Sequence, residues 1–365
     1  MQSACLDKGK ISLAVGLMSG TSLDGIDAAL LVTDGETFVK TRDFLSFPYP
    51  ASFRKKLRSV LGGKGPIPEV ECQLTELHTK VVKLLLKQAG VSNKNVRVIG
   101  FHGHTISHQP QLKKTWQIGD GSLLARQTGI DVIFDFRSND IAQGGQGAPL
   151  VPLFHKELAK NLEHPLAILN VGGVANVTWI GAEMDNPIAF DTGPGCALLD
   201  DWIWQATQIE SDIDGSFSGS GKIIPRVVKN YMASKYFERT PPKSLDRDEF
   251  DLFPLDGIST NDGAATLVEF TCEAIVRSLT FMPKRPKNWL VSGGGRHNPF
   301  LMKRLTEKLD VSVAPVESVG WDGDALEAQA FAYLAVRSLK GLPLTLPSTT
   351  GVKLPTQGGK LFKCI

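Results

Sequence analysis

The chain has 365 residues, enough for two domains that each bury a hydrophobic core. Hydrophobic residues make up 42% and charged residues 21%, as in soluble globular enzymes, and a net charge of +2 argues against a dedicated nucleic-acid-binding protein. No stretch is apolar over the ~20 residues of a membrane span, and the N-terminus has no apolar signal-peptide core, so we expect a cytoplasmic protein. The five cysteines include no CxxC pair, which argues against a disulfide framework or a structural zinc site.

The N-terminal segment predicts three strands, over residues 11–17, 26–32 and 38–47, because short apolar runs are separated by turn residues. The first turn, residues 19–25, is rich in Gly, Ser, Thr and Asp. It lacks the lysine of a P-loop. Its backbone N–H groups and hydroxyls can still bind phosphate, and its carboxylates can bind magnesium. The alternative is a purely structural hairpin turn.

Helices are predicted over residues 53–60 and 69–88, followed by a strand over residues 96–101. Beyond this strand, His102 and His104 either contact a polar substrate or are satisfied loop residues, because a third metal ligand is not evident. A short helix and a strand over residues 131–134 come next. The glycine-rich segment 135–152 is predicted to be the crossover between domains. Its Arg137 either binds an anion or a carboxylate, or is a solvated charge.

Residues 166–204 repeat the glycine-turn arrangement. Two predicted strands flank Gly172 and Gly173, a third strand ends on Asp191, and the sequence FDTGPG leads into a helix. Ligands in open α/β sheets bind at such strand ends, so Asp191 is a candidate functional carboxylate. The alternative is that Asp191 caps the following helix.

The last third of the chain contains a predicted mobile surface loop over residues 210–222 and an irregular surface segment over residues 225–256. After a helix over residues 264–279, a strand ends on the triplet Gly293, Gly294 and Gly295. An adenine ring fits where side chains are absent, although the triplet can also be a tight turn between strand and helix. Glu327 lies in the first turns of a final helix and is either a capping or a ligand-facing residue.

The two glycine-turn units predict an α/β fold with two similar domains, residues 1–140 and 141–365. This organisation resembles the actin–hexokinase–Hsp70 superfamily, whose ribonuclease H-like domains have a ligand cleft between them. At the family level, residues 15–339 resemble the bacterial anhydro-N-acetylmuramic acid kinases. The segments that carry this resemblance are GLMSGTSLDGIDAAL, HGHT, FRSNDIAQGGQGAPLVP, LNVGGVANVTWI, FDTGPGCALLDDW, VSGGGRHNPFL and DALEAQAFAYLA. His104 stands where the family pattern has a glutamine.

The resemblance implies an ATP- and Mg²⁺-dependent enzyme of cell-wall recycling, typically a homodimer, that opens the 1,6-anhydro ring of its amino sugar with water and phosphorylates O6. It implies that Asp191 is the catalytic base and that His102, Arg137 and Glu327 bind the sugar. The nucleotide-binding residues that it implies are Gly20, Thr21, Ser22, Leu23, Asp24, Gly25, Ile26, Asp27, Gly172, Gly173, Asn176, Gly193, Gly195, Gly293, Gly294 and Gly295. Two alternatives are a kinase of the same fold for an ordinary sugar hydroxyl and a non-catalytic actin- or chaperone-like ATPase module.

Overall fold

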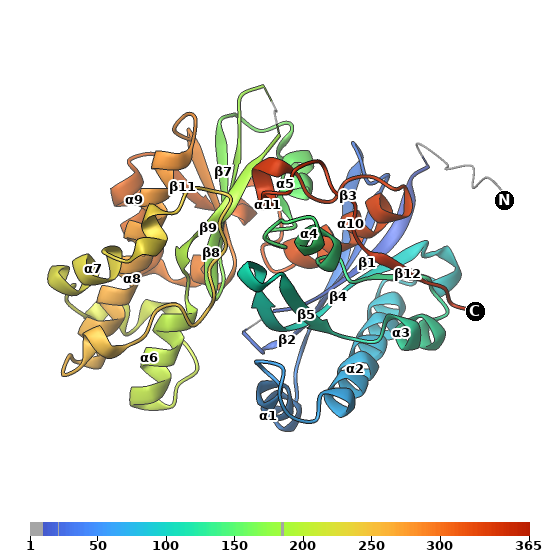
Figure 1. Ribbon diagram of the computed structural model, residues 1–365, viewed down its shortest axis with the longest axis horizontal. Coiled ribbons are helices and arrows are strands. Elements are labelled where there is room, and N and C mark those ends of the chain that lie inside the picture. The colour runs from blue at the N-terminus through green and yellow to red at the C-terminus, as the bar shows by residue number, and fades with distance from the viewer. Residues whose placement is uncertain (1–9, 21, 184–185) are drawn as a thin grey trace. The chain divides into compact units, whose positions relative to one another are not determined.

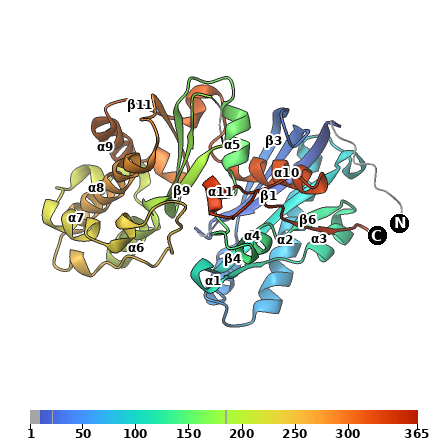
Figure 2. The ribbon, with the colours of Figure 1, turned by 45° about the horizontal axis from the view of Figure 1, so that its top comes forward.

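The computed structural model describes residues 10–20, 22–183 and 186–365. Contacts divide the chain into two units, of which the first contains residues up to 160 together with residues 324–365, and the second contains residues 161–323. This division differs from the expected domains 1–140 and 141–365, because residues 141–160 and the C-terminal residues 324–365 both belong to the first unit. Helix α10 (Leu326–Leu339) lies over the sheet of that unit (Figure 2).

The sheet of the first unit has the strand order β12-β6-β4-β1-β2-β3, with β5 paired to β4 (Figure 1). Strands β1, β2 and β3 are antiparallel neighbours, whereas β4 is parallel to both β1 and β6. The strands are β1 (Ser12–Ser19), β2 (Gly25–Thr33), β3 (Val39–Pro48), β4 (Val98–Gln109), β5 (Lys114–Ile118), β6 (Val132–Phe134) and β12 (Lys360–Phe362). The helices are α1 (Ala51–Ser59), α2 (Ile67–Gln88), α3 (Gly121–Thr128), α4 (Ser138–Ala142), α5 (Pro152–Ala159), α10 and α11 (Pro347–Thr350).

Close contact between the sheet and α10 explains two glycines of the first unit. A Cβ atom on Gly16 of β1 would lie 1.7 Å from the carbonyl oxygen of Ala328, and one on Gly100 of β4 would lie 2.0 Å from that of Phe331. Any larger residue would push the helix away from the strands. Helix α10 is therefore an integral part of the core of the first unit.

The second unit repeats the same topology with the strand order β11-β10-β7-β8-β9. Its first three strands are antiparallel neighbours, and β10 is parallel to both β7 and β11. The strands are β7 (Leu166–Val171), β8 (Val174–Ile180), β9 (Ile188–Pro194), β10 (Asn288–Ser292) and β11 (Ser312–Pro315). The helices are α6 (Ala197–Thr207), α7 (Pro225–Met232), α8 (Thr260–Ser278) and α9 (Pro299–Leu309). The predicted α/β fold of two similar domains is confirmed.

Two segments of the second unit are better ordered than the sequence predicted. Residues 210–222 form two short 3₁₀ turns around Asp212 and Ser218, both of which are buried. Residues 225–256 contain α7 and contribute Tyr236, Phe237 and Leu245 to the hydrophobic core. The prediction of an irregular surface segment there is wrong. In the described part of the chain, no helix combines the length and the apolar composition that a membrane crossing requires.

Candidate functional site

Asp191 lies within strand β9, which continues beyond it to Pro194, so the expected strand end at Asp191 is wrong. A bulge at Thr192 shifts the register, and Asn176 of β8 lies opposite Asp191. The same register places Asn170 of β7 opposite Asn176 and Ser292 of β10 beside Asn170. Directly paired residues point to the same face of a sheet. Four polar side chains thus form a row across the second unit.

The backbone and the carboxylate of Asp191 are both held by residues 236–245. The Asp191 N–H donates to the carbonyl oxygen of Lys243 (3.0 Å), the Leu245 N–H donates to Asp191 Oδ2 (2.8 Å), and the Tyr236 hydroxyl donates to the Asp191 carbonyl oxygen (2.6 Å). Helix α6 begins after Cys196 and has no side-chain cap. Asp191 therefore does not cap this helix, and the capping alternative is wrong.

The partners of Asp191 were missed in the sequence because they lie in the segment predicted to be on the surface. A signal was present in its aromatic residues, since Tyr231, Tyr236, Phe237 and Phe250 occur within one short stretch. The structure packs these rings against one another; the Phe237 and Phe250 ring centres, for example, lie 5.9 Å apart. A concentration of aromatic residues without a regular period can thus mark a buried loop.

The glycines near Asp191 allow two chain segments to approach closely. The N–H groups of Gly195 and Cys196 donate to the carbonyl oxygens of Gly173 and Gly172 (3.0 and 2.7 Å). A Cβ atom on Gly195 would lie 2.1 Å from the Gly172 oxygen. Gly193 instead faces helix α8, where its Cβ atom would lie 2.6 Å from that of a buried alanine. Close packing thus requires glycine at both 193 and 195, independently of any nucleotide.

The Gly293 triplet follows β10 as predicted. Gly293 has φ of +77°, and its Cβ atom would lie 2.3 Å from Asn170 Oδ1. A Cβ atom on Gly295 would lie 2.5 Å from the side chain of Val171. Gly294 is exposed and has no atom within 4 Å of the corresponding position. Of the three glycines, Gly294 leaves open space at the end of the strand.

In the first unit, the loop between β1 and β2 is closed by its own hydrogen bonds. The Leu23 N–H donates to the Gly20 carbonyl oxygen (3.2 Å), with Leu23 in the left-handed conformation at φ of +63°. The Ser22 hydroxyl donates to Asp24 Oδ1 (2.8 Å). Ser22 and Asp24 are exposed at this loop. Their oxygens are therefore placed where a solvent-borne ligand can reach them.

The other predicted residues of this loop have different environments. Gly25 donates its N–H to Asp24 Oδ1 (2.9 Å) and lies against the β3 backbone, because a Cβ atom there would lie 2.4 Å from the Phe47 oxygen. Ile26 is fully buried in the hydrophobic core, so its side chain does not contact a ligand. Thr21 lies outside the described residues.

Several carboxylates surround the end of this loop. Burial raises the pKa of Asp27 to about 7, and the nearby negative charges of Asp24, Glu327 and Asp324 raise it further. Burial also raises the pKa of Glu327. Such mutual repulsion is relieved by a proton or a cation. This part of the first unit is thus electrostatically suited to positive charge.

His102, Arg137 and Glu327 are brought together in the first unit. Arg137 donates from Nε and Nη2 to His102 Nε2 (3.2 and 3.0 Å) and from Nη1 to the Gly147 carbonyl oxygen (2.6 Å). Burial and the Arg137 charge hold the pKa of His102 well below its usual value, so the ring is neutral and Nδ1 donates to the Gly103 oxygen (2.9 Å). The charge of Arg137 in turn favours ionised Glu327.

The two histidines of the HGHT sequence lie inside β4, not in a loop beyond it. His104 is fully buried, and its Nδ1 forms a hydrogen bond with Ser19 Oγ (2.9 Å), which is also bonded to the Tyr49 hydroxyl (2.7 Å). Burial lowers the pKa of His104 to about 4. The residue that departs from the family pattern therefore supports the end of β1, immediately before the first loop.

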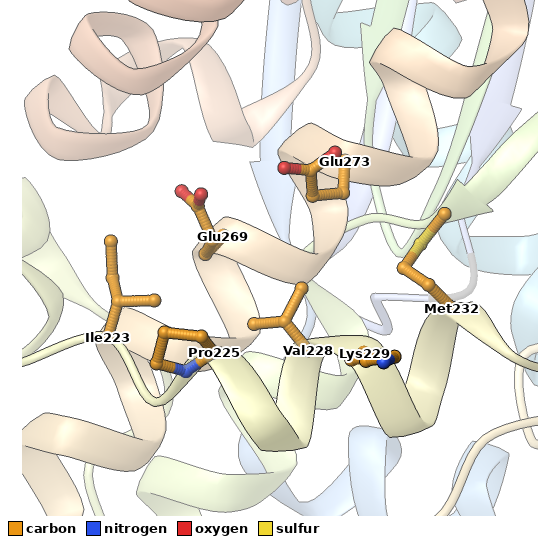
Figure 3. Close-up of a pocket in the computed structure, with 7 residues that line it drawn as sticks. All are labelled: Ile223, Pro225, Val228, Lys229, Met232, Glu269 and Glu273. Carbon is orange, nitrogen blue, oxygen red and sulfur yellow. The ribbon is translucent and has the colours of Figure 1, made fainter.

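No group of three or more His, Cys, Asp or Glu side chains among the described residues is placed to hold a metal ion. A pocket of about 270 Å³ lies on the second unit beside α7 and α8 (Figure 3). Its walls include Val228, Met232, Glu269 and Glu273, and none of the predicted site residues lines it. Glu269 is already paired with Arg304 of α9 (2.9 Å). This pocket is therefore separate from the expected chemistry.

Comparison with known proteins gives matches along almost the whole chain. A family model described as anhydro-N-acetylmuramic acid kinase matches residues 12–364. A protein of that name from Paramagnetospirillum magneticum is 53% identical over 351 residues, covering 95% of this chain and 99% of that protein. A second, from Rhodospirillum rubrum, is 51% identical, and the match covers 95% of this chain and 93% of that protein. A third, from Zymomonas mobilis, is 47% identical, and the match covers 96% of this chain and 99% of that protein.

Proposed function

The chain belongs to the anhydro-N-acetylmuramic acid kinase family, and from this premise we propose that it uses ATP and water to convert 1,6-anhydro-N-acetylmuramic acid into N-acetylmuramic acid 6-phosphate. The observation that carries the proposal is the identity of about half of all residues with proteins of that name along their full length. The geometry around Asp191 and Arg137 supports it.

Asp191 is the proposed catalytic base. Water becomes a competent nucleophile for the anomeric carbon when a carboxylate takes its proton. The bond from the anomeric carbon to O6 then breaks, and O6 forms a new bond to the γ-phosphorus while the bond from that phosphorus to the ADP oxygen breaks. Three hydrogen bonds fix Asp191, to Lys243, Leu245 and Tyr236, which suits a group that must hold its position during the reaction.

Arg137, His102 and Glu327 are the proposed sugar-binding residues. The neutral His102 ring accepts from two nitrogens of Arg137, and the Gly147 carbonyl accepts from the third, so the guanidinium is held in one orientation before a ligand arrives. An arginine so placed suits a carboxylate ligand, such as the lactyl group of a muramic acid. Glu327 can accept hydrogen bonds from sugar hydroxyls.

The first loop and the glycine turns of the second unit are the proposed nucleotide-binding elements. Mg²⁺ usually binds one or two protein carboxylates together with phosphates and water, so it does not need a cage of protein ligands. Asp24 and Asp27 fit this mode, because their neighbouring negative charges favour a cation. Bound there with ATP, Mg²⁺ would neutralise phosphate charge. Gly294, which has open space around its Cβ position, is the proposed site beside the adenine ring.

The proposal includes a cytoplasmic role in recycling cell-wall peptidoglycan and a homodimer. The substrate is a fragment of that polymer, and ATP is a cytoplasmic co-substrate. The oligomeric state is checked by sedimentation of the purified protein, for which a monomer at micromolar concentration would contradict the dimer.

The decisive experiment compares anhydro and reducing amino sugars as acceptors in ¹⁸O-labelled water. We expect one ADP per phosphorylated anhydro sugar, with the label on the anomeric carbon at early times, before exchange at that position. The Asp191→Asn variant is the matched control. Phosphorylation of the reducing sugar at an equal rate, or label in the ester oxygen, would contradict the proposed reaction.

A further inference from the structure

The side chain of Lys243 is buried in a cage of aromatic rings, with 5% of the residue exposed. Its Nζ lies 4.3 Å from the ring centre of Tyr236, 4.9 Å from that of Phe281 and 6.0 Å from that of Phe237, and it donates to the Tyr236 carbonyl oxygen (3.3 Å). The faces of these rings attract the ammonium group and offset part of its lost hydration. An apolar side chain would occupy the same cage without any desolvation cost, so the charge itself suggests a role.

Lys243 is also directly linked to Asp191. Its carbonyl oxygen accepts the Asp191 N–H (3.0 Å), and the N–H of Leu245, two residues later, donates to the Asp191 carboxylate (2.8 Å). Tyr236 contributes to both groups, because its ring faces the Lys243 ammonium and its hydroxyl bonds the Asp191 carbonyl. The caged cation and the buried carboxylate are thus attached to one short segment.

We propose that Lys243 is a positioning residue that acts through Asp191, keeping the buried Asp191 carboxylate ionised so that it can accept a proton from water. The inference rests on the proposed function, in which Asp191 is the base. Burial alone favours the protonated, neutral form of a carboxyl group, whereas a nearby positive charge favours the ionised form. The ammonium of Lys243 supplies such a charge.

The other charged groups around Lys243 agree with this role. Burial and the positive charges of Arg239 and Arg277 lower the pKa of Lys243 to about 8, whereas Asp191 raises it. Because a lysine is charged below its pKa, the ammonium is present at neutral pH. The ring of Tyr236 stays neutral, since burial and Asp191 raise the pKa of its hydroxyl. Arg239 is paired with Glu249 (3.5 Å) at the edge of the cage.

The test measures kcat/KM against pH for the parent protein and for Lys243→Met, Lys243→Gln and Lys243→Arg. Methionine fills the cage without charge, glutamine also keeps a donor for the Tyr236 carbonyl, and arginine keeps the charge. Removal of the Lys243 charge should shift the acid limb of the kcat/KM profile to higher pH by about one unit. Activity then falls up to about tenfold at acidic pH and stays near the parent value at pH 8, a pattern that general structural damage does not produce.

Lys229→Met is the matched control, because Lys229 is exposed on α7 of the same unit and should leave the profile unchanged. An acid limb that is the same in Lys243→Met or Lys243→Gln as in the parent would overturn the inference. So would an equal shift in Lys243→Arg.

A measurement without substrate separates this inference from the proposed function. The ¹³C signal of the Asp191 carboxyl, assigned by its absence in Asp191→Asn, is followed against pH in each variant that folds. We expect its titration to move upward by about one unit when the Lys243 charge is removed and to stay in place in Lys243→Arg. An unmoved titration overturns the inference even if the protein phosphorylates the anhydro sugar. A moved titration supports it even if the protein accepts another substrate.

Discussion

Replacement of Asp191 by asparagine should strongly reduce turnover with little effect on folding. Asparagine Oδ1 can accept the Leu245 N–H that Asp191 Oδ2 accepts now at 2.8 Å, and the two backbone hydrogen bonds, to Lys243 and from Tyr236, do not involve the side chain. A neutral acceptor in place of a charged one should cost about 1 kcal/mol. Because an amide cannot take the proton from water, kcat should fall on the order of 10²–10⁴-fold.

Thermal unfolding, calorimetric titration with nucleotide and initial rates of ADP release on the anhydro sugar together check this expectation. Asp191→Ala is the comparison that exposes the structural contribution, because it leaves the Leu245 N–H without its acceptor and should destabilise the fold by about 1–3 kcal/mol. A folded Asp191→Asn protein that turns over at close to the parent rate would refute the assignment of the base.

Three further changes test other parts of the site. Arg137→Met should raise the KM for the sugar about tenfold or more without changing nucleotide affinity; an unchanged KM in steady-state kinetics would contradict sugar binding by Arg137. Burial raises the pKa of Asp27 to about 7, so between about pH 4 and 7 the folded state binds a proton that the unfolded chain has released, and stability should fall as pH rises. Asp27→Asn should remove this pH dependence, which amounts to a few kcal/mol at most, when the free energy of unfolding is measured by denaturant titration at pH 5 and at pH 8. Equal pH dependence in the parent and the variant would refute this expectation. Gly195→Ala should destabilise the second unit by roughly 1–3 kcal/mol, since its Cβ atom would lie 2.1 Å from the Gly172 oxygen; an unchanged melting temperature would contradict this.

The repeated sheet was predictable because its strands have local signals. Residues 26–32 and 166–171 are short apolar runs bounded by glycine turns, and the structure places β2 and β7 there. The grouping of His102, Arg137 and Glu327 followed only from the family resemblance. No local pattern connects residues so far apart in sequence, because their proximity depends on how α10 packs against β4.

The surroundings of Asp191 could not be predicted for a different reason. Tyr236 and Lys243 lie in short turns and irregular chain, which have neither the period of a strand nor that of a helix. A lysine in such a segment is normally assigned to the surface. Only the aromatic cage, assembled in part from Phe281 on another element, shows why it is buried.

The position of α10 in the chain has a consequence for the order in which the protein folds. Strands β1, β2 and β4 leave the ribosome before the whole second unit, whereas the helix that covers them leaves after it. Residues 161–323 are continuous, so this unit can complete its core while translation is still under way. We therefore expect the second unit, residues 161–323, to fold before the first unit is complete. Until α10 arrives, the N-terminal strands expose an apolar face to chaperones and to aggregation.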